Sequence, residues 1–158
     1  MEFKLMQPGQ EEEVIALVRE VFTEIVAPGY SEQGLSEFYH YANSESLIGR
    51  SKNDHFTVLA LEDETIYGAI EIRAAHHVSM FFVRSQHHNH GIGRALLADA
   101  ITRIATMDSD IRQLTVNASI NAVAAYKNFG FTVGSEEQCR NGIRYVPMEL
   151  RLHEERPA

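Results

Sequence analysis

The stretch His87–Leu97, with the sequence HHNHGIGRALL, combines residue types that can do chemistry. Gly91 and Gly93 precede an apolar helical pattern, and glycine lets the backbone approach a ligand closely. The first amides of a helix lack intrahelical partners and lie at the positive end of its dipole. Such a turn suits a phosphate group, although these residues alone equally allow a glycine-rich turn without a ligand.

Two familiar nucleotide-binding patterns are absent from this stretch. The dinucleotide pattern G-x-G-x-x-G requires a third glycine, and Leu96 stands at that position. The P-loop requires Gly-Lys followed by Ser or Thr, which the chain lacks. A phosphate site would therefore depend on the short glycine turn and the helix after it.

The histidines raise the question of a metal site, and the candidates are His76, His77, His87, His88 and His90. A zinc site needs three or four ligands that converge on one point. The spacing of these histidines matches neither H-E-x-x-H nor a Cys/His finger. We therefore expect no metal, and we expect His87 and His90 to be exposed loop residues.

Hydrophobic periodicity predicts one domain of the α/β class, with mixed α+β character. Alternating apolar residues predict strands at 55–62 and 66–74, and further strands are predicted at 2–6, 77–83, 112–118, 130–137 and 143–152. Helical spacing predicts helices at 10–27, 31–41, 91–107 and 119–129, and the segment 43–50 could add a short further helix that the order below does not count. The order β-α-α-β-β-β-α-β-α-β-β indicates a central, mostly antiparallel mixed sheet of about six to seven strands with helices on both faces. We assign this domain to residues 1–152 and treat 153–158 as a C-terminal tail.

The composition narrows the class of function. The 158 residues are 44% hydrophobic and 23% charged, which is ordinary for a globular protein. The net charge of −8 argues against broad binding to nucleic acid or to an anionic membrane, and it suits a cationic or neutral substrate. Cys139 is the only cysteine, and no apolar stretch is long enough to span a bilayer. We expect a reducing, cytoplasmic setting.

The sequence resembles the GNAT superfamily of acetyl-CoA-dependent N-acetyltransferases. The family pattern Gln/Arg-x-x-Gly-x-Gly/Ala is matched by HNHGIG at residues 88–93, with His88 in place of the usual Gln or Arg. The second family pattern, N-x-x-A-x-x-x-Y-x-x-x-G-F, is matched in NASINAVAAYKNFGF by Asn121, Ala124 or Ala125, Tyr126, Gly130 and Phe131. The resemblance implies a single GNAT-like domain, acetyl-CoA as co-substrate, and the homodimer that many relatives form.

The resemblance also implies where the cofactor lies. The pantetheine arm would pair with the strand backbone at Phe81, Phe82 and Val83. Asn121 would contact this arm, although it could equally satisfy local backbone at the start of a helix. The pyrophosphate would lie on the glycine turn, whose residues are His88, Asn89, His90, Gly91, Ile92, Gly93 and Arg94.

Acetyl transfer to an amine needs a group that takes a proton and a group that gives one. The resemblance assigns the acid to Tyr126, which could instead simply pack in the core. His77 stands where the histone-acetylating branch of the family has its catalytic glutamate; alternatively, it is a histidine hydrogen-bonded beside the sheet. Glu71 is the rival base, and its alternative is a solvent-facing polar pair with Arg73, because the two residues share a strand face.

The acceptor pocket is predicted from the first helices, where aromatic and acidic residues suit an amine cation. These residues are Tyr30, Phe38, Tyr39, Tyr41, Glu32 and Glu37; Phe38 and Tyr41 could instead be core residues. The first function predicted is direct transfer of an acetyl group from acetyl-CoA to a primary amine of a small molecule or peptide. The alternatives are a non-catalytic acyl-CoA-binding sensor on the same fold and a metal-dependent hydrolase.

Overall fold

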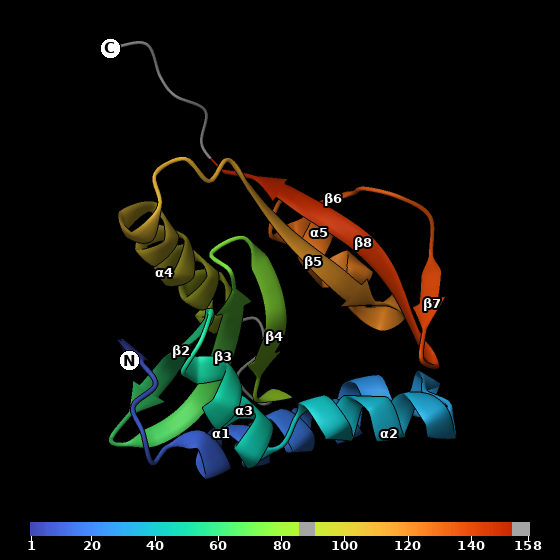
Figure 1. Ribbon diagram of the computed structural model, residues 1–158, viewed down its shortest axis with the longest axis horizontal. Coiled ribbons are helices and arrows are strands. Elements are labelled where there is room, and N and C mark those ends of the chain that lie inside the picture. The colour runs from blue at the N-terminus through green and yellow to red at the C-terminus, as the bar shows by residue number, and fades with distance from the viewer. Residues whose placement is uncertain (86–90, 153–158) are drawn as a thin grey trace.

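The strands and helices follow one another largely as the patterns predict, in a computed structural model that describes residues 1–85 and 91–152 (Figure 1). Residues 86–90 and 153–158 lie outside the described residues. The predicted tail and the motif residues His88, Asn89 and His90 fall there, as does His87.

A single mixed sheet forms the centre of the domain, in the order β1-β2-β3-β4-β5-β8-β6, with β7 paired to β8. All neighbouring strands are antiparallel except β4 and β5, which run parallel. The strands are β1 (Glu2–Leu5), β2 (His55–Glu62), β3 (Thr65–Arg73), β4 (His77–Val83), β5 (Gln113–Ser119), β6 (Thr132–Val133), β7 (Gln138–Arg140) and β8 (Ile143–Arg151).

The sheet has eight strands, which is more than the six to seven predicted. The segment predicted as one strand at 130–137 contains only the short β6, and β7 forms just after it. Asn141 (φ 52°) and Gly142 (φ 83°) both adopt left-handed backbone angles, which is the geometry of a tight hairpin turn. This turn returns the chain directly from β7 into β8.

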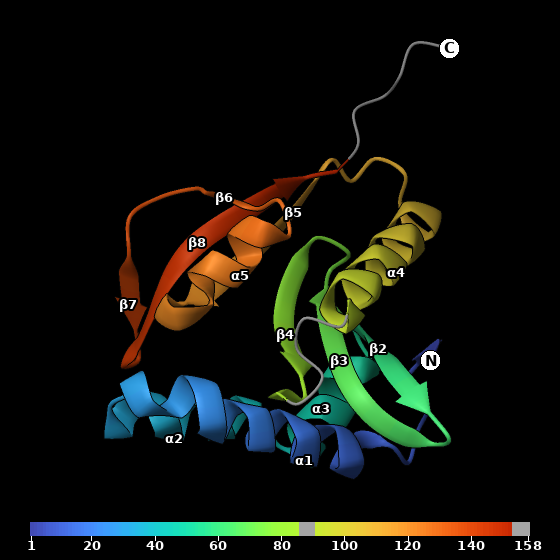
Figure 2. The same cartoon turned by 180° about the vertical axis from the view of Figure 1, so that it is seen from behind.

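Helices cover both faces of the sheet (Figure 2). One face has α1 (Glu11–Val21), η1 (Phe22–Val26), η2 (Ala27–Gly29), α2 (Glu32–Tyr41) and α3 (Ser44–Ser51); the other has α4 (Ile92–Met107), η4 (Ile120–Ala122) and α5 (Val123–Asn128). The helix predicted at 10–27 is α-helical only to Val21; η1 is a π-helical turn and η2 a 3-10 turn containing Pro28, which has no amide hydrogen to donate. The helix predicted at 119–129 likewise begins with a 3-10 turn.

Each face of the sheet has its own apolar core. Along β3, Ala69 packs toward α1 and α3, whereas Ile70 and Ile72 pack toward α4 and α5. This alternation follows the two-residue period of a strand. Among the described residues, no helix combines the length and the apolar character needed to cross a bilayer.

The two strands at the centre of the sheet separate after a short parallel ladder. β4 and β5 pair only at His77–Thr115 and Val78–Val116. On the other side of β4, the register with β3 shifts because Ile72 pairs with Val78 and Glu71 with Met80, which leaves Ser79 as an extra residue. Beyond this bulge, β4 and β5 diverge in both views (Figures 1 and 2). The bulge and the divergence position the site described next.

Candidate active site

A cavity of about 920 Å³ lies between the diverging strands β4 and β5. Its walls include all seven residues of β4, part of η1 and α2, the start of α4, the η4–α5 segment and the β7–β8 hairpin. We call the part next to Gly91, Gly93 and Arg94 the α4 end. The part next to Glu37, Tyr41, Arg73, His77 and Arg140 is the α2 end.

The α4 end presents backbone amides. Gly91 has φ 80°, and its carbonyl accepts the first helical hydrogen bond, from the Ala95 amide at 3.0 Å. The amides of Ile92, Gly93 and Arg94 therefore precede the first intrahelical donor, and no side chain among the described residues caps the helix. A Cβ built on Gly91 would meet no atom of the described residues within 4 Å. This arrangement fits an anionic group such as a pyrophosphate.

The side chains at this end have other roles. Ile92 is buried in the core, so only its backbone is available to a ligand. Arg94 donates to the Asn128 carbonyl at 3.0 Å, and its guanidinium lies 5.7 Å from the centre of the Phe129 ring. This contact joins the start of α4 to the end of α5.

The predicted pantetheine segment, Phe81–Val83, lines the cavity along its length. The Arg84 amide donates to the Tyr67 carbonyl on β3, so strand alternation turns the backbone of Phe81 toward β5. The β4–β5 ladder has already ended at Val78, and the Phe81 backbone therefore faces the cavity. The ring of Phe81 stacks on Phe129, with ring centres 5.5 Å apart.

Tyr126 reaches the cavity from α5 and is 9% exposed. Its ring packs edge-on against Phe81, Phe129 and Phe131. Burial raises the pKa of the phenol above its ordinary value, so the hydroxyl keeps its proton across the neutral range. Core packing and access to the cavity are thus combined in one residue.

His77 lies at the start of β4, lines the cavity and is 9% exposed. Burial first, and then the positive charge of Arg73, lower its pKa from 6.5 to about 4, with smaller effects from His76 and His55. The imidazole is therefore neutral at pH 7.

His77 makes a hydrogen bond through Nδ1, and its direction depends on the tautomer of the ring. His77 Nδ1 lies 2.7 Å from Thr115 Oγ1, and that hydroxyl donates to the His76 carbonyl at 3.3 Å. Thr115 Oγ1 can accept from Nδ1–H of His77 while its own proton goes to that carbonyl, and our proposal uses this tautomer. Nε2 is then left with a lone pair, which is the state that a general base requires.

Glu71 is completely buried, so the solvent-facing pair with Arg73 that we considered is wrong. Arg50 of α3 covers it: Nε lies 2.9 Å from Oε2, and Arg50 NH2 lies 3.2 Å from Oε1. Ser79 Oγ donates to Oε1 at 3.0 Å, and the Tyr41 hydroxyl lies 3.5 Å from the same oxygen. Glu71 does not line the cavity, whereas Ser79 and Tyr41 do.

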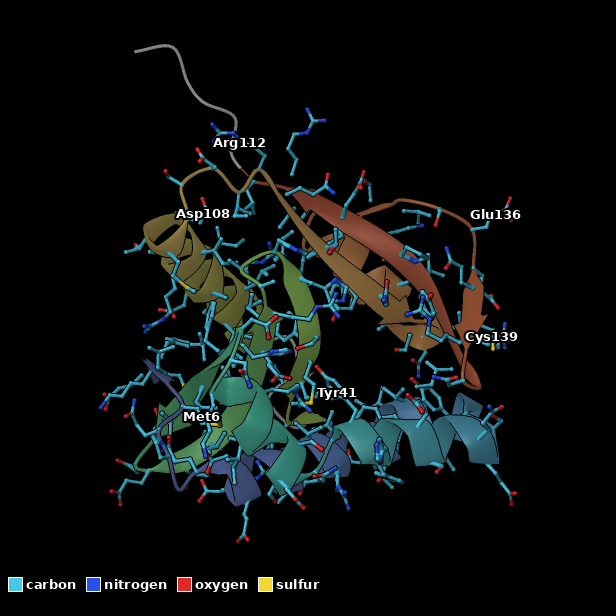
Figure 3. The ribbon with its side chains drawn as sticks, in the orientation of Figure 1. Met6, Tyr41, Asp108, Arg112, Glu136 and Cys139 are labelled. Carbon is cyan, nitrogen blue, oxygen red and sulfur yellow. The ribbon has the colours of Figure 1, made fainter. Side chains whose placement is uncertain are left out.

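The sequence analysis missed two residues of this network, Ser79 and Arg50, and of these Arg50 also holds Tyr41. Its NH1 donates to the Tyr41 carbonyl at 2.7 Å, and its guanidinium lies 3.7 Å from the centre of the Tyr41 ring. Figure 3 shows Tyr41 beside α2, near the lower end of β4. The alternation of β3 predicts that Glu71 and Arg73 share one face of the sheet. It does not predict that α3 covers Glu71 on that face.

Asn121 lines the cavity, and its side chain already has two partners. Nδ2 donates to the Ile25 carbonyl of η1, and Oδ1 accepts from Ser119 Oγ at 3.1 Å. Ser119 makes no capping hydrogen bond to the turn that follows it. Asn121 thus fastens η4 to η1 across the mouth of the cavity.

The aromatic and acidic residues predicted for the acceptor divide into two groups. Tyr30, Glu37, Phe38 and Tyr41 line the cavity, whereas Glu32 and Tyr39 do not. Phe38 stacks on Phe22 at 3.7 Å between ring centres, so it also belongs to the helical core. Within residues 1–85 and 91–152, no group of three or more His, Cys, Asp or Glu residues could hold a metal ion.

A family model described as the acetyltransferase (GNAT) domain matches residues 26–152. The chain belongs to the GNAT acetyltransferase family. Residues 26–152 include both ends of the cavity, all of β4 and Tyr126. Among curated protein sequences, nothing matches this chain.

Solved structures with this GNAT fold include N-acetyltransferases. A GCN5-related N-acetyltransferase from Rhodopseudomonas palustris has a TM-score of 0.80 at 19% identity, with 96% of this chain and 95% of that chain covered. PaiA N-acetyltransferase from Thermoplasma acidophilum, in complex with coenzyme A, has a TM-score of 0.77 at 22% identity, with 96% of this chain and 100% of that chain covered. An aminoglycoside 6′-N-acetyltransferase complexed with coenzyme A has a TM-score of 0.71 at 10% identity, with 99% of this chain and 100% of that chain covered. Identities this low establish the shared fold and no more.

Proposed function

We propose that this GNAT protein transfers an acetyl group from acetyl-CoA to a primary amine of a small molecule or peptide, directly within a ternary complex. The observation that carries the proposal is the single cavity that joins the first amides of α4 to His77 and Tyr126. Two relatives of the same fold were solved with coenzyme A, which supports the choice of co-substrate.

The α4 end is the proposed site of the coenzyme. The amides of Ile92, Gly93 and Arg94 receive the pyrophosphate, and His88, Asn89 and His90 belong to the same proposed turn. The arm runs along Phe81, Phe82 and Val83 and passes Asn121. When bound, acetyl-CoA supplies a thioester whose oxygen gathers negative charge during attack and whose sulfur leaves as a thiolate.

Two side chains move the protons. The amine nitrogen forms a bond to the acetyl carbon, the carbon–sulfur bond breaks, and the products are an N-acetyl amine and the free thiol. His77 Nε2 accepts the proton that the nitrogen loses, directly or through a water molecule. Tyr126 gives its phenolic proton to the sulfur and recovers one from solvent afterwards.

Glu71, the second candidate base, takes an indirect part in this proposal. Its carboxylate is completely buried, and it meets the cavity only through the hydroxyls of Ser79 and Tyr41. Any proton that reaches Glu71 from the cavity must pass through one of these hydroxyls. We therefore assign the direct role to His77, which lines the cavity itself.

The test has two steps on the full chain. Acetyl-CoA should raise the thermal midpoint in a dose-dependent way, because a ligand that binds the native state stabilises it. Thiol release is then followed with a panel of primary amines. The double variant His77→Gln/Tyr126→Phe should keep the thermal shift and lose the release.

The outcomes separate the proposed enzyme from a sensor on the same fold. A thermal shift without release for any amine would contradict the enzyme and support a non-catalytic acyl-CoA sensor. The absence of a shift at millimolar acetyl-CoA would contradict the assignment of the α4 end.

We extend the proposal to the setting of the protein. Cys139 is exposed at the outer edge of β7 (Figure 3), and a free exposed thiol is stable in a reducing compartment such as the cytoplasm. We propose residues 1–152 as the catalytic domain, with no nucleic-acid or membrane partner. The family resemblance predicts a homodimer, which sedimentation would test; a monomer at all concentrations would contradict it.

A further inference from the structure

The α2 end of the cavity carries charged side chains that no other described residue neutralises. Arg73 of β3 and Arg140 of β7 line it, are exposed, and make no hydrogen bond or ion pair within the described part of the chain. Glu37 of α2 also lines it and makes no hydrogen bond or ion pair within the described part of the chain. By contrast, side-chain hydrogen bonds to described residues engage Arg19, Arg50, Arg84, Arg94, Arg103, Arg112 and Arg144.

Arg73 lies beside the proposed reacting atoms. It pairs directly with His77 in the β3–β4 register, so the two side chains project from the same face. Its charge lowers the pKa of His77 and acts on Tyr41 across the cavity. A ligand atom that His77 can reach is therefore also in the field of the Arg73 guanidinium.

Arg140 lies on the rim of the same end. The β7–β8 turn is held against the start of α2, where Ser31 Oγ donates to the Gly142 carbonyl at 3.3 Å. The fit there is close, because a Cβ built on Gly34 would lie 2.7 Å from that carbonyl oxygen. Arg140 thus lines the cavity at the hairpin end of β8, beyond the Ser119–Tyr145 pair, whereas His77 lies at the level of Thr115.

The charge balance of this end is positive, although the whole chain has a net charge of −8. Arg50 neutralises the charge of Glu71. The remaining charges that line this end are the positive charges of Arg73 and Arg140 and the negative charge of Glu37. An acceptor whose only charge is an ammonium would be repelled by Arg73. A carboxylate would instead match the planar fork of a guanidinium.

We propose that the acceptor amine also carries a carboxylate that Arg73 binds, which places the acceptor in the amino-acid class. This inference rests on the proposed acetyl transfer. Because Arg73 adjoins His77, the carboxylate lies close to the reacting nitrogen, as it does in an α-amino acid.

The arrangement links acceptor binding to the basicity of His77. The positive charge of Arg73 is the second cause of the low pKa of His77. A bound carboxylate offsets this charge, so the pKa of His77 rises when the acceptor is in place.

The experiment compares α-amino acids with their α-amides, in which a neutral group replaces the carboxylate. The rates are compared at equal concentrations of free amine, because the amide lowers the pKa of its own amino group. We expect kcat/KM to favour the free acid by about 10- to 100-fold, the range of a charge-assisted hydrogen bond. Arg73→Gln should remove this preference, Arg73→Lys should keep part of it, and the control Arg144→Gln, which lies outside the cavity, should keep all of it.

Two results would overturn the inference: equal use of acids and amides, or a preference that survives Arg73→Gln. Calorimetry with amino acids in the presence of coenzyme A separates this inference from the proposed function. If no amine releases thiol, the proposed function fails, but amino-acid binding that Arg73→Gln abolishes would still establish the carboxylate site. If no amino acid binds, the inference is wrong whatever the activity.

Discussion

The two ends of the cavity recognise ligands in different ways. The α4 end uses backbone: the left-handed Gly91, the first amides of α4, and the Phe81 backbone that β5 no longer pairs. The α2 end uses side chains that five elements contribute, namely α2, α3, β3, β4 and β7. A backbone site tolerates changes in side chains, so it suits a ligand that stays constant. A side-chain site changes with each substitution, so it suits a ligand that differs from one protein to the next.

Tyr126 lines the cavity, and its replacement should have the largest effect. Tyr126→Phe removes the proton donor but keeps the ring that packs on Phe81 and Phe131. We expect kcat to fall by about 10²- to 10⁴-fold, the usual contribution of a positioned acid, with little change in the KM for acetyl-CoA. Steady-state thiol release measures both constants. Tyr39→Phe, outside the cavity, is the matched control, and an equal loss there would refute the assignment.

Arg50→Met tests the α2 end through its buried ion pair. The variant leaves the Glu71 carboxylate buried without its cation, so we expect the free energy of unfolding to fall by about 3–5 kcal/mol. Chemical denaturation measures this change. Arg103→Met breaks the partly exposed pair with Asp99 and should cost less than about 1 kcal/mol.

The Arg50→Met variant also tests whether the two ends of the cavity act separately. Its folded fraction should bind acetyl-CoA with unchanged affinity, because the ion pair lies at the α2 end. A loss of acetyl-CoA affinity without loss of stability would mean that the two ends are not separate.

The pH dependence of stability tests the environment of His77. Its folded pKa of about 4 lies below the ordinary 6.5, so the unfolded chain binds the proton more readily between these values. The stabilisation is present above about pH 6.5 and is lost as the pH falls toward 4, by at most about 3 kcal/mol. Unfolding at about pH 7 and about pH 4.5 should show less acid destabilisation in His77→Gln than in wild type. The exposed His40→Gln serves as the control and should behave like wild type.

Gly91→Ala tests the backbone of the α4 end and should have the smallest effect. Alanine at φ 80° carries a strain of about 1–2 kcal/mol, which α4 can relieve only by moving its first amides. We expect the dissociation constant of acetyl-CoA to rise about 10-fold, as measured by calorimetry. Gly49→Ala, in α3 with open space around it, should leave this constant unchanged. Equal acetyl-CoA affinities in the two variants would contradict a role of Gly91 in binding the coenzyme.

The α4 end could be predicted from the sequence because its parts are contiguous. The glycine turn and the helix after it occupy one short stretch, and their geometry follows from residue types alone. The alternating pattern of β4 likewise placed His77 and Phe81 on one strand. No local pattern in β4 or β5 encodes the short parallel ladder that ends at Val78.

The α2 end could not be predicted in the same way, because its contacts join residues far apart in the chain. Arg50 and Glu71 are 21 residues apart, and His77 and Thr115 are 38 apart. Strand alternation gives the face of Glu71 but not the helix that covers it, which is why a solvent-facing pair with Arg73 was considered. The hydrogen-bond partner of His77 Nδ1 is a threonine of another strand, and no sequence pattern links the two residues.

The central claim is that both substrates occupy one cavity together and react directly. Initial rates of thiol release, measured while acetyl-CoA and an amine acceptor are varied against each other, test it most directly. The account predicts intersecting double-reciprocal lines, because transfer requires the ternary complex. Parallel lines, which indicate an acetylated enzyme intermediate, or release that does not depend on the amine, would contradict it.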